Sequence, residues 1–251
     1  MDDNTGRIYE KYGINPKERE LENRDVFNKQ MKELNDMNRE RLVKEFNDGL
    51  EKNFDDLKEY LSFYTVTIFS ELKSNIFQNI QCLTVNAYSA SIALTNHTLE
   101  RLLKLALIQN EIGLRPVKIT DWNDTYKEPH QYSKMVLHKT IKLCHECNLI
   151  SDLQEKYLTD MREQIRNGFS HFDPNKILIN HKETSEIYFP NENPEDSYSI
   201  DVNMKQIPVL QDYYVRKFAR ENALPYFDYV FHLIRSIEKE LKYKHNFGEK
   251  L

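Results

Sequence analysis

The sequence predicts an all-α fold, and three observations carry that prediction. The chain of 251 residues contains only 6 Gly and 8 Pro, which is few for a protein rich in turns and strands. Apolar residues recur at steps of three and four over long stretches, which is the period of an amphipathic helix. The breaks between these stretches contain Pro, Gly and Asn. We therefore expect a helical bundle interrupted by one short β-prone insert.

Residues 1–61 predict a charged helical arm, either one long helix or a helical hairpin. A short apolar stripe is followed by a longer one, both at helical spacing: Phe27, Met31 and Leu34, then Val43, Phe46, Leu50, Phe54, Leu57 and Leu61. A stripe this narrow suits packing on the rest of the chain, and it equally suits pairing with a second copy. The pattern leaves both interpretations open.

Residues 62–251 predict the main helical domain. We expect helices near 63–81, 84–110, 133–148, 153–168 and 206–243, with Gly113 ending the second and Ser151 or Asp152 capping the fourth. Residues 114–132 predict a long loop because they contain Pro116, Pro129 and few periodic apolar positions. Within residues 175–204, the runs ILIN, EIYF and SYSIDV alternate with polar turns, which indicates a small β-hairpin insert.

Composition and charge narrow the classes of function. The net charge is −5, whereas general nucleic-acid-binding proteins usually carry excess positive charge, so contact with RNA would need a local basic cleft. Three cysteines give no disulfide framework and favour a reducing compartment. Cys144 and Cys147 are interpreted as buried thiols, with no metal site. With no apolar leader and no membrane-length segment, we expect a cytoplasmic protein.

The segment MREQIRNGFSHFDP, residues 161–174, contains the residues best suited to chemistry. The bare spacing from Arg166 to His171 would arise by chance in a chain of this length, but Asn167 directly after the Arg and the Asp-Pro ending sharpen it. Histidine can transfer a proton near neutral pH, and the Arg guanidinium forms a fork that matches phosphate oxygens. Such residue types suit phosphodiester cleavage without a metal or cofactor, in which the 2′-OH of RNA is the nucleophile. Arg162 and Ser170 are weaker candidates for contacts to phosphate.

The spacing within this segment has a geometric consequence. In a regular helix, residues five apart lie about 140° from each other, so one helix cannot easily direct both Arg166 and His171 at one phosphate. Either the backbone departs from helical geometry near Gly168, or a second copy of the segment completes the site. Arg162 and Arg166 share a helix face, where they could form a local positive strip.

The IRNGFSHF run resembles the Arg-x(4–6)-His motif of HEPN ribonucleases, which usually have a polar residue directly after the Arg. The helix TLERLLKLALI and the predicted helices over 133–168 also resemble that family's bundle. The resemblance implies metal-independent RNA cleavage at a site shared by a homodimer, with Arg166, Asn167 and His171 as catalytic residues. It further implies a toxin or an antiviral defence effector, kept in check by an inhibitor or antitoxin protein.

The same residues admit a purely structural interpretation. Arg166 could pair with a carboxylate, Asn167 could cap a helix, and His171 could be a buried histidine bonded to the backbone. The alternative function is therefore a non-catalytic helical dimer, an interaction or regulatory module with a degenerate site.

Overall fold

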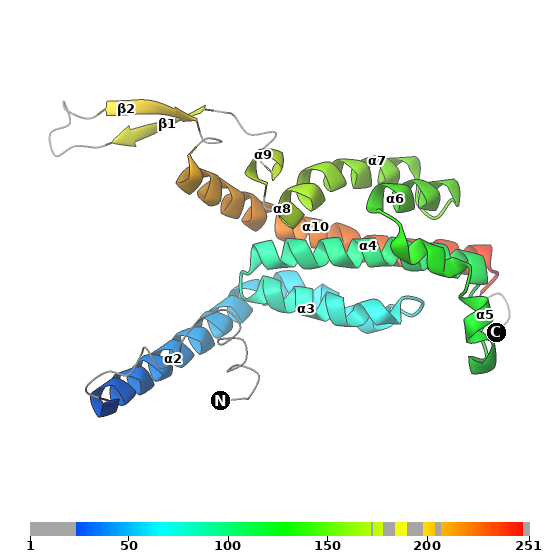
Figure 1. Ribbon diagram of the computed structural model, residues 1–251, viewed down its shortest axis with the longest axis horizontal. Helices are drawn as coiled ribbons and strands as arrows, with labels where there is room; N and C mark the ends of the chain where they lie inside the picture. Colours follow the sequence, from blue (N-terminus) through cyan, green and yellow to red (C-terminus); the bar gives the residue numbers. More distant parts are fainter. Residues whose placement is uncertain (1–23, 172, 178–183, 190–197, 204–206, 248–251) are drawn as a thin grey trace. The chain divides into compact units, whose positions relative to one another are not determined.

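The structure is a computed structural model that describes residues 24–171, 173–177, 184–189, 198–203 and 207–247. The chain forms two compact units, residues 1–48 and 49–251. Most of the described residues are helical, as the sequence predicted (Figure 1). The prediction of a mostly helical chain is therefore confirmed.

The predicted arm contains one continuous helix, α2 (Arg24–Leu57). Within the first unit Phe27 and Met31 are partly exposed. The other large apolar side chains of α2 in this unit are between 42% and 61% exposed, namely Leu34, Met37, Leu42, Val43 and Phe46. The described part of the arm is thus a helix whose apolar stripes are not buried within its own unit.

The second unit begins where α2 meets the end of α3 (Lys73–Thr84). Gly49 lies against the backbone carbonyl of Thr84, where a Cβ atom could not fit. One turn later, the Asn53 side-chain amide donates to the carbonyl oxygens of Leu83 and Thr84, both at 3.2 Å. The glycine and the asparagine together fix the last turns of α2 on α3.

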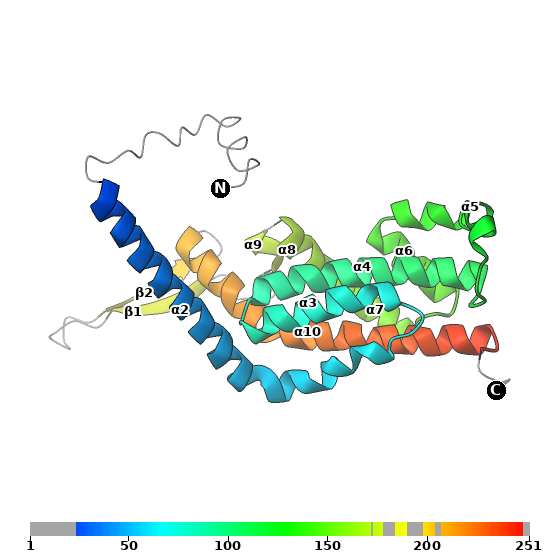
Figure 2. The ribbon, with the colours of Figure 1, turned by 90° about the horizontal axis from the view of Figure 1, so that it is seen from below.

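Three helices form the core of the second unit. α4 (Tyr88–Ile112) and α10 (Pro208–Lys244) lie side by side, and α3 packs along both (Figure 2). Fully buried apolar side chains fill the space between them, including Phe69, Ile76, Ile92, Leu99, Leu102, Leu103, Tyr226, Phe231 and Ile234. α6 (Leu137–Glu146) packs on α4, and α7 (Asp152–Met161) packs on α6.

The region predicted as one helix over 63–81 is broken into three parts. A 3-10 helix (Lys58–Thr65) and a short 3-10 turn (Ser70–Leu72) precede α3. Between them, Glu238 of α10 accepts hydrogen bonds from the backbone N–H groups of Thr67, Ile68 and Phe69 at 2.8, 2.6 and 3.2 Å. Helical backbone would use these N–H groups internally, so a carboxylate from a distant helix explains the break.

The predicted loop over 114–132 contains short helical turns, among them α5 (Trp122–Thr125). Pro208 lies in the first turn of α10, where its missing N–H breaks no helical hydrogen bond, and Pro225 lies inside the same helix. β1 (Thr184–Phe189) and β2 (Tyr198–Asn203) pair antiparallel, with Thr184 opposite Asn203 and Phe189 opposite Tyr198.

Candidate functional site

The helix carrying the candidate motif changes geometry at the motif. Ser151, one of the two predicted caps, caps α7 in a capping box with Gln154. After Met161 the chain makes a π-helical turn, Arg162–Arg166, in which the Asn167 N–H bonds to the Arg162 carbonyl five residues back. α8 (Asn167–His171) and α9 (Pro174–Ile177) follow. π-turns inside α-helices are frequently found at functional sites.

Arg166 is held by two side chains. Its Nε donates to Glu100 Oε1 of α4 at 2.8 Å, and its Nη1 donates to Asn167 Oδ1 at 3.2 Å. Neither contact uses Nη2. The side chains of Arg166 and Glu100 are 31% and 26% exposed, so the pair lies at the rim of the core, within reach of solvent. Such a pair fixes the direction of the guanidinium.

The neighbouring Arg162 is also paired. Its Nη2 contacts Glu163 Oε1, and the amide of Asn167 donates to the other oxygen of Glu163 at 3.3 Å. The Nε of Arg162 is buried and has no hydrogen-bond partner among the described residues. Arg162 and Arg166 are thus part of one network with two carboxylates, and the predicted positive strip is compensated by Glu100 and Glu163.

Gly168 has a different role from the one expected. The departure from α-helical geometry lies upstream, at the π-turn, and Gly168 itself is inside α8. A Cβ on Gly168 would stand 2.6 Å from Ile177 Cγ1 and 3.2 Å from Ile177 N. The glycine therefore allows α9 to pack closely on α8. The Asp173 N–H bonds to the Gly168 carbonyl at 2.8 Å and marks the end of the helix.

The backbone of α8 includes Ser170 and His171, and their side chains lie outside the described residues. The structure brings together Arg162, Arg166 and Asn167 from the predicted set. Sequence reasoning missed Glu100 and Glu163, which complete the network. Glu100 sits in LERLLKL, where a glutamate has the pattern of an ordinary exposed position on a helix, so no local signal singled it out.

Buried polar groups lie behind Glu100. One turn earlier on α4, Asn96 is 4% exposed, and its Oδ1 accepts a hydrogen bond from the Tyr226 hydroxyl at 2.8 Å. Burial raises the pKa of Tyr226 well above its usual range, and Glu100 adds to that rise. Burial also raises the pKa of Tyr229, whose ring lies 4.1 Å from that of Tyr157, to about 12. Both tyrosines therefore remain neutral at physiological pH.

Of the two cysteines interpreted as buried thiols, Cys144 is buried and Cys147 is only partly buried. Cys144 is fully buried with its Sγ 3.5 Å from the Leu103 carbonyl, and burial raises the pKa of its thiol. Within the described ranges no group of three or more His, Cys, Asp or Glu side chains could hold a metal ion.

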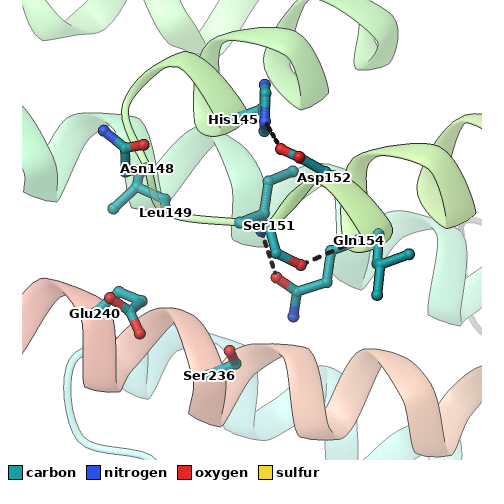
Figure 3. Close-up of a pocket in the computed structure, with 10 residues that line it drawn as sticks. His145, Asn148, Leu149, Ser151, Asp152, Gln154, Ser236 and Glu240 are labelled. Carbon is teal, nitrogen blue, oxygen red and sulfur yellow. Dashed lines mark hydrogen bonds and ion pairs between the residues drawn. The ribbon is translucent and has the colours of Figure 1, made fainter.

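A cavity of about 820 Å³ lies between the α6–α7 turn and α10 (Figure 3). Its lining comprises His145, Asn148, Leu149, Ile150, Ser151, Asp152, Leu153, Gln154, Ser236 and Glu240. His145 is held between two carboxylates, with Nε2 2.7 Å from Asp152 Oδ1 and Nδ1 3.2 Å from Glu155 Oε2. This cavity includes none of Arg162, Arg166 and Asn167.

Comparison with known proteins adds no relative. No protein-family model, no curated protein and no solved structure matches the chain. No helix in the described part of the chain combines the length and apolar character needed to span a membrane.

Proposed function

We propose that the protein is a metal-independent endoribonuclease of the HEPN type, with its site at Arg166, Asn167 and His171. The observation that carries the proposal is the fixed guanidinium of Arg166, which Glu100 and Asn167 hold through Nε and Nη1 while Nη2 takes part in neither contact. A guanidinium held in one direction beside a π-turn suits a phosphate group that approaches from solvent.

The proposed reaction uses the 2′-OH of RNA as the nucleophile. His171 removes the 2′-OH proton or protonates the leaving 5′-oxygen, and Arg166 stabilises charge on the phosphoryl group. The products are a 2′,3′-cyclic phosphate and a 5′-hydroxyl. Two proton transfers require two groups, and a homodimer supplies a second His171, so the proposal includes a site shared by two copies. In a cell, such an activity needs an inhibitor or antitoxin and suits a toxin or antiviral defence effector.

A second candidate function is a non-catalytic interaction or regulatory module. The ion pair between Arg166 and Glu100 favours this alternative, because the Glu100 carboxylate already binds the guanidinium that would have to bind phosphate. In this alternative the network of Arg162, Glu163, Arg166 and Asn167 only joins the π-turn to α4. The two functions differ in what happens when Arg166 or His171 is removed.

The decisive experiment is RNA cleavage in excess chelator. We expect wild-type protein to cleave single-stranded RNA and to leave cyclic phosphate ends, whereas RNA with 2′-O-methyl groups stays intact. His171→Ala and Arg166→Ala should each lower the rate by about 10²-fold or more. His97→Ala is the matched control, since His97 is an exposed histidine on α4 outside the motif.

The outcomes separate the candidates. Intact RNA with folded wild-type protein across several substrates would reject the nuclease and leave the interaction module. Cleavage that survives both His171→Ala and Arg166→Ala would reject the assigned site. Light scattering on the same samples tests the homodimer, with a monomeric mass in the active sample arguing against a shared site.

A further inference from the structure

A second cavity lies at the far end of α4 from the candidate catalytic residues. It has a volume of about 380 Å³, which falls within the range of small-molecule sites. Gln109, on its wall, is nine residues beyond Glu100 and so about 14 Å further along the helix. The lining residues are Thr67, Ile68, Gln109, Ile112, Leu114, Arg115, Pro116, Val117, Trp122, Tyr126 and Phe247.

Three aromatic side chains form part of this lining while remaining largely exposed. Trp122 is 50%, Tyr126 is 39% and Phe247 is 54% exposed. Exposed aromatic rings that gather around one cavity offer flat apolar surfaces on which a planar ring can stack. They lie on two segments far apart in sequence, α5 with the turn after it and the turn that follows α10, so the fold brings them together.

The polar side chains of the cavity are free to bind a ligand. The side chains of Thr67, Gln109 and Arg115 make no hydrogen bond or ion pair with any other described residue. Arg115 is the one charged residue among the described residues of the lining, and its positive charge favours an anionic ligand. A carboxamide such as that of Gln109 can both donate to and accept from the edge of a base.

Two contacts hold the walls in place before any ligand arrives. The carboxylate of Glu238 binds the backbone N–H groups of Thr67 and Ile68 at 2.8 and 2.6 Å. On the opposite segment, the Trp122 indole N–H donates to the Val117 carbonyl at 3.1 Å. A cavity with fixed walls loses less conformational entropy when it binds a ligand.

We propose that this cavity binds a free nucleoside monophosphate. Its base stacks among Trp122, Tyr126 and Phe247, Gln109 and Thr67 bond to polar atoms of the nucleoside, and Arg115 binds the phosphate. Aromatic walls alone would suit many apolar ligands, but the unpaired cation and the unpaired carboxamide together match a ring with hydrogen-bonding edges and an anionic group. The proposal concerns a site distinct from Arg166 and does not depend on RNA cleavage.

The test uses the full chain and adenosine 5′-monophosphate as the probe. Trp122 is the only tryptophan, so its fluorescence reports on this cavity alone, and calorimetry measures the same binding independently. We expect saturable binding of the monophosphate, and binding of adenosine weaker by about tenfold or more, because adenosine lacks the charge-assisted bond to Arg115.

Substitutions in the lining test whether the nucleotide binds in this cavity. Arg115→Gln should weaken binding of the monophosphate by about tenfold or more and should leave binding of adenosine unchanged. Trp122→Leu should weaken binding of both the monophosphate and adenosine, as measured by calorimetry. Arg101→Gln is the control, since Arg101 is an exposed arginine on α4 that does not line the cavity, and it should bind as wild type. Equal binding by wild type and Arg115→Gln would overturn the proposal. So would binding of a single-stranded oligonucleotide without binding of the free nucleotide, or calorimetry without heat up to about 10 mM.

Discussion

Removal of the Glu238 carboxylate should destabilise the second unit far more than removal of an ordinary surface charge. Glu238 is 5% exposed, and one of its oxygens accepts from three successive backbone N–H groups at 2.8, 2.6 and 3.2 Å. In Glu238→Ala these donors lose their acceptor, the Phe69 N–H at a buried position and the other two at partly buried positions, and the segment 67–69 loses its hydrogen bonds to α10.

The expected loss follows from the number and kind of bonds. A hydrogen bond to a charged group contributes about 1.5–3 kcal/mol net, and bonds that share one oxygen do not add fully. We therefore expect Glu238→Ala to lower the free energy of unfolding by about 3–5 kcal/mol. Glu238→Gln retains a neutral acceptor oxygen, so we expect it to cost about 1–2 kcal/mol.

Urea denaturation followed by circular dichroism measures the loss. With a slope of about 2–3 kcal/mol per molar, Glu238→Ala should move the midpoint down by about 1–2 M. Glu240→Ala is the matched control two residues along α10, because its side chain makes no hydrogen bond or ion pair with the other described residues, and it should change stability by about 0.5 kcal/mol or less. A loss below about 1 kcal/mol for Glu238→Ala, close to that of the control, would refute the role given to this carboxylate.

Three further predictions concern other parts of the chain. Gly168→Ala should lower stability by about 1–2 kcal/mol, because a Cβ would meet Ile177 at 2.6 Å; unchanged urea unfolding would contradict the close packing of α8 and α9. The pKa of His145 is raised chiefly by its bond to Asp152, so the imidazolium stabilises the fold at low pH, and that stabilisation is lost as pH rises above 6.5 and through the folded-state pKa. Thermal unfolding of wild type and His145→Gln should therefore differ at about pH 6 and converge at about pH 9, and a constant difference would count against the bridge. Glu100→Gln leaves an acceptor for Arg166 Nε but removes the opposing charge, so RNA should bind a few-fold more tightly, as read by KM; weaker binding would mean that the charge of Glu100 is needed to place Arg166.

Periodicity predicted the long helices well, because their apolar faces are buried against one another. The predicted helix over 84–110 corresponds to α4 and that over 206–243 to α10, and Gly113 ends α4 with a φ of 81°. The helix expected over 63–81 was wrong for its first half, because α3 begins only at Lys73. Its pattern is helical, but the acceptor that takes its N–H groups is Glu238, about 170 residues away, and no local pattern contains that contact.

The candidate site also depends on a tertiary contact that the local sequence pattern does not contain. The motif placed Arg166 and Asn167 side by side, and their hydrogen bond at 3.2 Å agrees with that. Glu100 joins Arg166 only because α4 packs against the π-turn, a tertiary contact that spacing within one segment cannot supply. The angular argument correctly anticipated a departure from α-helical geometry, but it placed the departure at Gly168 rather than at Arg162–Arg166.

The π-turn also sets the rotational phase of everything that follows it. A π-turn holds one more residue than an α-helical turn, so an unbroken α-helix through the same residues Arg162–Arg166 would place each following residue one helical step further around the axis. Every later position of α8 would then rotate by about 100° about the axis. Asn167 and Gly168 would then each face the surroundings that an adjacent position faces now. Gly168 would no longer lie against Ile177. One residue in this turn thus acts as a spacer that lets two helical segments with different inward faces share one axis.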